Sequence, residues 1–165
     1  MNELLDYFKN IVSISPEIEN KLNEIIKERS LVKGEQILPE NSLKKEHIFV
    51  VSGCLRSFYK REDGKEHTLQ FAIKNWWISD YITLYTDNKS VVSIESLTHS
   101  KVLIIDNSKV EKFYQEFPQF EIIQRKNFEK RISALQTRIL SLLALTASEK
   151  YNQFIENYTE FEKII

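Results

Sequence analysis

The chain has 165 residues, of which 42% are hydrophobic and 28% are charged, so it is long enough to form one domain with a buried core and an appendage. Its 23 basic and 24 acidic residues give a formal net charge of −1, whereas a domain built to grip nucleic acid usually carries a strong basic excess. A single cysteine excludes an internal disulfide, and three glycines with three prolines leave no room for a flexible linker.

No segment of the sequence is typical of a membrane or secreted protein. It contains neither a run of eighteen apolar residues nor a signal-peptide pattern. We therefore expect a soluble, cytoplasmic protein with no membrane partner.

The first thirty residues have helical periodicity. Apolar residues predict a short helix over Asn2–Val12. Ser15 is a good cap and Pro16 suits a first helical position, so a second helix is expected to begin there. Its predicted buried face consists of Ile18, Leu22, Ile25 and Ile26.

Residues 31–105 have the pattern of short strands and tight turns. Runs rich in β-formers occur at His47–Val51, Leu55–Lys60 and Val91–Leu97. Asp63 and Gly64 are typical of a two-residue hairpin turn. About eight short strands at this spacing predict a sandwich, barrel or jelly roll.

The segment from Pro118 to Leu145 carries the longest unbroken helical pattern. Ser108 and Glu111 have the spacing of a capping box, which predicts a short helix leading into it. The long helix has an apolar stripe and otherwise mostly charged or polar faces; the stripe is Phe128, Ile132, Leu135, Ile139 and Leu142. Because core helices and coiled-coil seams share this spacing, the helix packs either on its own domain or on a second copy.

A shorter amphipathic helix is expected after the long one. Thr146 and Glu149 form another capping box, which starts a helix just after the long one ends. Its apolar positions are Tyr151, Phe154, Ile155 and Tyr158.

Five segments, in their order and spacing, are similar to a known family. They are Lys33–Leu38, Ile48–Arg56, Asp63–Glu66, Ser93–Leu97 and Val102–Asp106. Together they resemble the Crp/Fnr family of bacterial transcription regulators, and the lysine-, isoleucine- and asparagine-rich composition looks like that of the family's Bacteroidetes branch.

The resemblance implies an α+β fold. Its core would be a double-stranded β-helix, that is, a jelly-roll or cNMP-binding-like β-roll, with N-terminal helices and a long C-terminal dimerisation helix. The expected organisation is a sensor domain over residues 1–117, a dimerisation helix over 118–145, and the start of a C-terminal DNA-binding region over 146–165.

The resemblance also implies a function. The chain would be the effector-sensing and dimerisation part of a homodimeric regulator, with the apolar stripe as the dimer seam. DNA would be bound by a helix-turn-helix that is not present in these residues, so we expect a piece of a longer protein. If the protein ends naturally at Ile165, the alternative is a stand-alone sensor or adaptor that does not bind DNA.

In this family a phosphate-binding cassette holds the ligand. The resemblance places Trp77 in its first part, Ser79 at the glycine and Asp80 at the glutamate. Ser90 falls at the arginine, or Lys89 does if the alignment slips by one residue. Losing an arginine that pairs a buried phosphate could cost about 3 kcal/mol, roughly a hundredfold in affinity. We therefore expect a degenerate cassette, no cofactor and no ordinary cAMP binding, with another small effector or none as the open alternatives.

Other candidate residues receive simpler interpretations. Trp76 and Trp77 could stack on a ring, but paired aromatics at a strand end are more often core and rim. Cys54 is expected to be a buried structural thiol. A cupin-like metal enzyme would require the β-roll to gather three scattered histidines, which are His47, His67 and His99. Since neither the ligand spacing of such a site nor a catalytic set is present, we expect no metal site and no enzyme.

Overall fold

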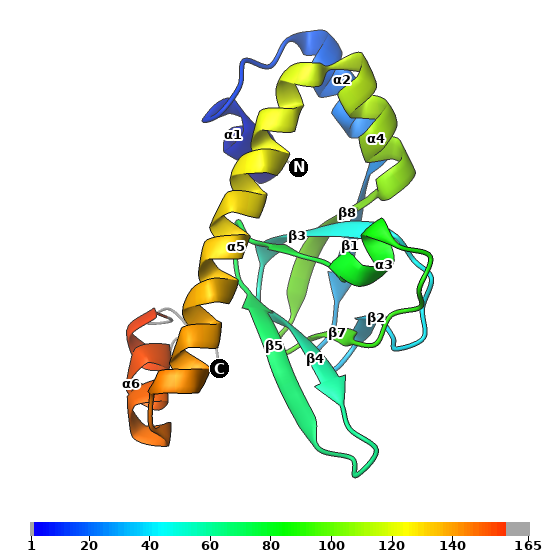
Figure 1. The fold of residues 1–165 in the computed structure, drawn as a ribbon. Helices are drawn as coiled ribbons and strands as arrows, with labels where there is room; N and C mark the ends of the chain where they lie inside the picture. The colour runs from blue at the N-terminus through cyan, green and yellow to red at the C-terminus, as the bar shows by residue number, and fades with distance from the viewer. Residues whose placement is uncertain (1, 158–165) are drawn as a thin grey trace. The chain divides into compact units, whose positions relative to one another are not determined.

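A computed structural model describes residues 2–157 of the chain. The chain forms two compact units, residues 1–118 and residues 119–165. The first unit holds two N-terminal helices and an antiparallel β-roll, and the second holds a long helix followed by a shorter one (Figure 1). The predicted fold class is therefore confirmed.

Two helices open the chain, α1 (Asn2–Lys9) and α2 (Pro16–Ile25). The hydroxyl of Ser15 accepts a hydrogen bond from the backbone N–H of Ile18 at 3.3 Å, and Pro16 occupies the first turn, as predicted. Helix α1 ends earlier than predicted and does not reach Val12.

Ile26 was predicted to lie on the buried face of α2, and this was wrong. It has extended backbone angles (φ −86°, ψ 133°) and starts strand β1 (Ile26–Leu31). The strand pairs antiparallel with β8, where Ile26 faces Ile105. Helix α2 therefore ends before Ile26, because pairing with the distant strand β8 outweighs the local helical periodicity.

Eight strands of the described chain form the β-roll. After β1 they are β2 (Gln36–Leu38), β3 (Glu46–Ser52), β4 (Leu55–Lys60), β5 (Glu66–Ala72), β6 (Trp77–Ile78), β7 (Ser93–Ser96) and β8 (Ser100–Asp106). One four-stranded sheet has the order β1-β8-β3-β6 and the other β2-β7-β4-β5. All of these pairs are antiparallel, which agrees with the predicted jelly-roll type of fold.

The core of the roll consists of apolar side chains from both sheets. These are Leu31, Ile37, Leu38, Ile48, Val50, Leu55, Ala72, Ile78, Ile94, Val102 and Ile104, all buried. Full burial of one such aliphatic side chain stabilises the fold by about 1.5–3 kcal/mol, alanine excepted. This burial also fixes the register of the strands, because a slip of one residue would turn these side chains toward solvent.

The hairpin between β4 and β5 is present, but its turn is longer than the predicted two residues. Arg61 N–H donates to the Lys65 carbonyl, and Gly64 N–H donates to the Arg61 carbonyl, each at 2.9 Å. Gly64 has φ +83°, the left-handed conformation that a three-residue hairpin loop requires at this point.

Two short helices flank the roll, α3 (Tyr81–Tyr85) and α4 (Asn107–Glu116). Figure 1 shows α4 beside α2, where Lys21 pairs with Glu116 at 3.4 Å. The capping box predicted for α4 was wrong, because the cap is Asp106, whose carboxylate accepts from the N–H of Ser108. Asp is as good a cap as Ser, and the strand that ends at Asp106 fixes which of the two is used.

A 3-10 turn (η1, Pro118–Phe120) begins at the last residue of the first unit, and the second unit contains helix α5 (Glu121–Ala144) and helix α6 (Ala147–Asn157). The long helix is thus confirmed, although its first three predicted residues form the tighter turn. The capping box of α6 is also confirmed, since Thr146 N–H donates to the Glu149 carboxylate and Glu149 N–H donates to the Thr146 hydroxyl. Tyr158 lies outside the described residues. No helix in the described part combines the length and apolar character needed to cross a membrane.

Candidate functional site

The residues predicted for the cassette lie on one continuous strand–helix–loop segment of the β-roll. Trp77 belongs to β6, Ser79 and Asp80 follow that strand directly, and α3 begins at the next residue. Lys89 and Ser90 lie on the loop between α3 and β7. The segment therefore has the strand, short helix and loop that the resemblance implies.

Asp80 is bound within its own helix. It is 7% exposed. One carboxylate oxygen accepts from the N–H of Ile82 at 3.0 Å, and the other accepts from the hydroxyl of Thr83 at 2.8 Å. Asp80 is therefore the N-cap of α3, a role that was not predicted from the sequence. Both oxygens of this buried carboxylate are thus engaged in hydrogen bonds within the segment.

Ser79 and Ser90 also form their hydrogen bonds with the chain itself. The Ser79 hydroxyl donates to the carbonyl of Ile78, and the Ser90 hydroxyl donates to the carbonyl of Val92, each at 2.7 Å. Ser90 is 1% exposed. Its backbone N–H donates to the Ser42 carbonyl at 2.8 Å, which fastens the cassette loop to the loop before β3. The Ser90 hydroxyl therefore points back to the backbone of its own segment.

Lys89 is the only lysine or arginine among residues 77–92, so it alone supplies positive charge to this segment. Lys89 is exposed. An exposed ammonium group is strongly hydrated and lacks the planar fork with which arginine binds a phosphate through two hydrogen bonds.

The Trp77 ring packs against aromatic side chains of α1 and β3. Its ring lies 5.1 Å from that of Phe49, 6.4 Å from that of His47 and 6.5 Å from that of Phe8, measured between centroids. Trp76 is 40% exposed, so the two tryptophans divide between core and rim as expected.

The three histidines are not gathered into one site. His47 lies on β3, His67 on β5 and His99 in the turn before β8, and the last two are exposed. Among the described residues no group of three or more histidine, cysteine or acidic side chains could hold a metal ion.

Cys54 is fully buried after the turn at Gly53. Its backbone N–H donates to the hydroxyls of Thr98 and Ser100, at 3.0 and 3.2 Å. Burial raises the pKa of the thiol to about 11. Cys54 is thus protonated at neutral pH and fits the predicted structural role. Gly53 is required beside it, because its φ is +85° and a Cβ there would lie 2.2 Å from the Ser100 hydroxyl oxygen.

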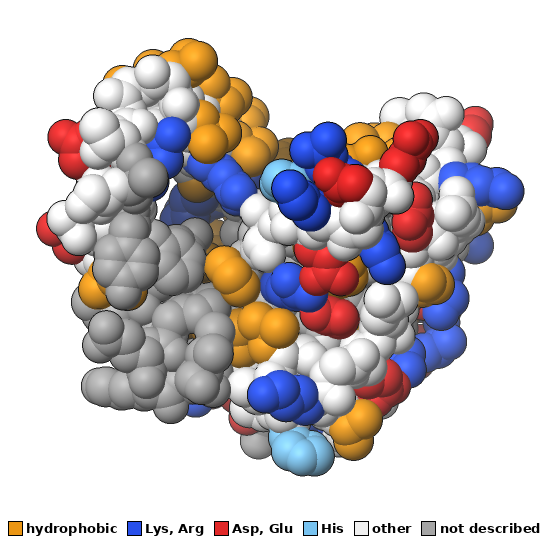
Figure 2. All heavy atoms as spheres, turned by 90° about the horizontal axis from the view of Figure 1, so that it is seen from below, with side chains coloured by type: hydrophobic (Ala, Val, Ile, Leu, Met, Phe, Trp, Pro, Cys, Tyr) orange, Lys and Arg blue, Asp and Glu red, His pale blue; other side chains and the backbone are white. Residues whose placement is uncertain are grey.

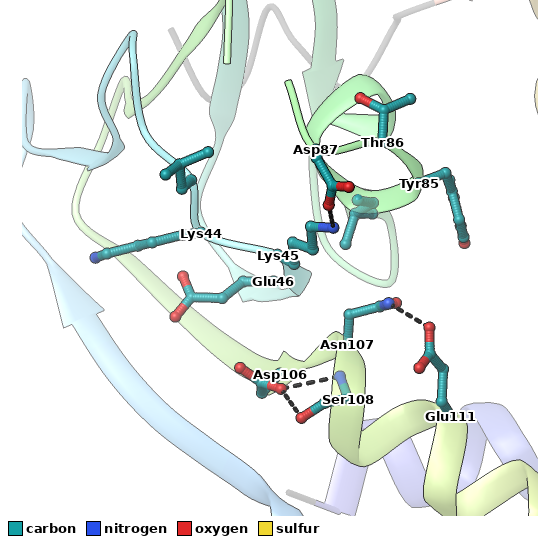
Figure 3. A pocket seen from close by; sticks show the side chains of 12 residues that line it. Lys44, Lys45, Glu46, Tyr85, Thr86, Asp87, Asp106, Asn107, Ser108 and Glu111 are labelled. Atoms are coloured by element: carbon teal, nitrogen blue, oxygen red, sulfur yellow. Dashed lines mark hydrogen bonds and ion pairs between the residues drawn. The ribbon is translucent and has the colours of Figure 1, made fainter. Parts of the chain in front are cut away.

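The β-roll unit also contains a cleft of about 630 Å³ that no sequence motif predicted. Figure 3 shows that its lining comes from the loop before β3, the C-terminal end of α3 and the start of α4. Lys45 pairs with Asp87 at 3.1 Å across it. Asn107 donates to the carboxylate of Glu111 at 2.8 Å and also binds the ring of His47, at 2.8 Å. No periodicity signals this arrangement, because its lining comes from three separate segments, residues 43–46, 84–87 and 106–111.

The apolar stripe on α5 is exposed in the single chain. Its last four members, Ile132, Leu135, Ile139 and Leu142, are between 47% and 64% exposed, and Phe128 is partly exposed. Exposed apolar side chains at coiled-coil spacing are typical of a helix that pairs with another helix.

A family model described as the cyclic nucleotide-binding domain matches residues 28–117. The chain belongs to the cyclic nucleotide-binding domain family. This membership covers the β-roll and α4. A comparison with curated proteins found no match.

Solved structures with the same fold include three bacterial regulators. The Thermus thermophilus catabolite activator protein is 18% identical, with a TM-score of 0.62 and coverage of 78% of this chain and 61% of its own. FixK2 from Bradyrhizobium japonicum is 20% identical, with a TM-score of 0.70 and coverage of 81% and 65%.

The third structure is CLP from Xanthomonas campestris, described as a c-di-GMP-responsive global regulator. It is 11% identical, with a TM-score of 0.70 and coverage of 87% of this chain and 72% of its own. At these identities the likeness shows the fold. The chain spans less than two thirds of the length of the Thermus and Bradyrhizobium proteins.

Proposed function

We propose that this chain is the effector-sensing and dimerisation part of a Crp/Fnr-type transcription regulator. The observation that carries the proposal is the exposed apolar seam of α5, which follows a cyclic nucleotide-binding β-roll in the chain. The fold neighbours are a catabolite activator, a global regulator and FixK2, which supports a regulatory role. The proposed role is therefore to bind an effector and a second copy of the chain, and it does not involve catalysis.

The residue types of the seam favour a parallel pair of helices. With Phe128, Leu135 and Leu142 at the d positions of a heptad, the a positions are Ile132 and Ile139. Isoleucine at a with leucine at d packs best in a two-stranded parallel coiled coil, because of the angle at which each side chain enters the partner's hole.

The charges beside the seam support the same orientation. Arg131 and Arg138 occupy successive g positions. In an antiparallel pair g positions face each other, which would place these arginines opposite one another. In a parallel pair they face the partner's e positions instead, which hold Gln136 and Leu143. The homodimer is therefore inferred to be parallel.

We infer that the cassette is degenerate and that cAMP is not the effector. The internal hydrogen bonds of Asp80 and Ser90 and the lack of a cassette arginine support this. The example of CLP, described as responsive to c-di-GMP, indicates that this fold serves other effectors.

DNA binding is assigned to a helix-turn-helix that is not part of the described structure. Figure 2 shows basic and acidic side chains interspersed over the described part of the face in view, with no basic patch there. Together with the net charge of −1, this supports placing the contacts to DNA outside the β-roll.

The proposed seam is tested by the mass of the particle in solution. We expect a dimer for the wild type and a monomer for Leu135→Arg, because a buried charge in the seam should weaken pairing by about a hundredfold or more. Thr137→Arg is the matched control, since it adds the same charge at an exposed f position on the opposite face and should leave the dimer intact. A monomeric wild type, or a Leu135→Arg variant that is still dimeric in light scattering, would overturn the proposal.

A further inference from the structure

His47, Asn107 and Glu111 form a hydrogen-bonded chain that joins strand β3 to helix α4. The ring Nε2 of His47 lies 2.8 Å from Oδ1 of Asn107, and the Asn107 amide donates to Glu111 at 2.8 Å. Since the carboxylate can only accept, the amide nitrogen of Asn107 must face Glu111 and its oxygen must face His47. Nε2 of His47 therefore carries the hydrogen, and the unprotonated Nδ1 is the atom that accepts a proton in acid.

This chain holds the first turn of α4. Asn107 is the first residue of the helix and is 7% exposed. Its backbone N–H donates to the Lys45 carbonyl at 2.8 Å, just before β3 begins. Both the side chain and the backbone of Asn107 thus attach α4 to the same end of β3.

Burial of His47 disfavours its charged form. Trp77 from β6 packs edge to face against the ring and carries no charge. The charges that face the ring from other elements are Glu111 on α4 and Asp106 at the end of β8, and Glu46 precedes it on its own strand. Burial lowers the pKa of His47, while the hydrogen bond to Asn107 and the two facing carboxylates act in the opposite direction.

We propose that the His47–Asn107–Glu111 chain is a proton-sensitive latch, which holds the first turn of α4 against β3 at neutral pH and loosens in mildly acid solution. A protonated ring gains a second N–H that needs an acceptor or water, and the packed site supplies less hydration than solvent does. Asn107 and Glu111 line the cleft of Figure 3, so solvent can reach the latch without unfolding of the roll.

The sign of the effect follows from linkage. In an opened or unfolded form His47 regains its ordinary pKa of 6.5, whereas the closed form has a lower one. Below pH 6.5 the open form therefore binds more protons, and the closed latch loses stability until the pH falls past the lowered pKa. Because η1 and α5 follow α4 in the chain, the latch links proton binding in the β-roll to the element before the proposed dimer helix.

The test is amide hydrogen exchange in the first turn of α4 at about pH 5.5 and about pH 7.5, corrected for the intrinsic rate. We expect protection there to fall by about threefold or more at the lower pH, relative to the amides of β4. His47→Gln keeps an N–H donor but cannot titrate, so its protection should not depend on pH. His67→Gln and His99→Gln remove exposed imidazoles and should behave as the wild type does.

Protection of α4 that is independent of pH in the wild type, or equally dependent on pH in His47→Gln, would overturn the proposal. If His47→Gln does not fold, the NMR titration of His47 in the wild type decides. A midpoint below that of a histidine in the unfolded chain supports the latch, and an unshifted midpoint overturns it. These readouts do not involve dimerisation, so failure of the latch and failure of the proposed function are distinguishable.

Discussion

Asp80 stabilises the fold at a position where the resemblance predicts a ligand-binding residue. In the resemblance it stands at a ligand-binding glutamate, yet its two oxygens accept from Ile82 and Thr83 inside α3. The carboxylate thus supplies, from within the chain, the negative group that favours a helix start. Asp80 therefore stabilises the start of α3 within the predicted cassette.

We expect Asp80→Ala to lower the free energy of unfolding by about 2 kcal/mol. Loss of an N-cap costs about 1 kcal/mol, and the fully buried hydroxyl of Thr83 would lose its acceptor, which adds about another 1 kcal/mol. Urea unfolding followed by circular dichroism measures the change. Asp80→Asn keeps an acceptor for the cap and should lose much less. Equal losses in the two variants would show that the cap is not what Asp80 contributes.

The elements of the fold were largely predictable where the signal is local. The Ser15 cap, the Thr146–Glu149 capping box and the long amphipathic helix all rest on neighbours in sequence, and all three are present. Two of the errors occurred where strand pairing between distant segments decides, whereas the end of α1 and the length of the β4–β5 turn were local features that the pattern misjudged. Ile26 continues a helical period but pairs with Ile105, and Asp106 caps α4 because β8 ends there.

Arg56 is an element-scale feature that the sequence did not indicate. It lies on β4 and binds Glu95 on β7 at 2.7 Å and Glu66 on β5, so one guanidinium joins three strands of a sheet. Its guanidinium carbon also lies 4.3 Å from the ring centroid of Phe58. Such a contact becomes apparent only when the strand order β7-β4-β5 is known.

Arg56→Lys should therefore destabilise the sheet although it preserves the charge. A lysine cannot bind both carboxylates through a planar fork, and we expect a loss of about 1–2 kcal/mol in the free energy of unfolding. Arg61→Lys is the control, because Arg61 is exposed and pairs with Asp63 across 3.6 Å at the hairpin tip. That change should cost less than about 0.5 kcal/mol. Similar losses for the two variants in thermal or urea unfolding would contradict the role assigned to Arg56.

At the scale of the whole molecule, the residues predicted for the cassette lie on one strand–helix–loop segment, whose internal hydrogen bonds the sequence did not indicate. Trp77, Ser79, Asp80, Lys89 and Ser90 lie on the expected strand, helix start and loop. That the Ser90 hydroxyl turns back to Val92, and that the cleft brings Lys45 to Asp87, depend on loop conformations that composition and spacing do not determine.

The chain as a whole should not respond to cyclic nucleotides, even though it belongs to the cyclic nucleotide-binding domain family. A ligand present at a hundred times its dissociation constant stabilises a protein by about 2.7 kcal/mol, which raises the melting temperature by several degrees. With no arginine in the cassette and with Asp80 and Ser90 bonded internally, we expect millimolar cAMP or cGMP to leave the melting temperature unchanged. A cAMP-binding member of the family, measured alongside, shows that the assay detects binding. Saturable micromolar binding, seen in the melting temperature or in the fluorescence of Trp76 and Trp77, would instead mean that Lys89 and the backbone of α3 suffice for the phosphate and that the cassette is still functional.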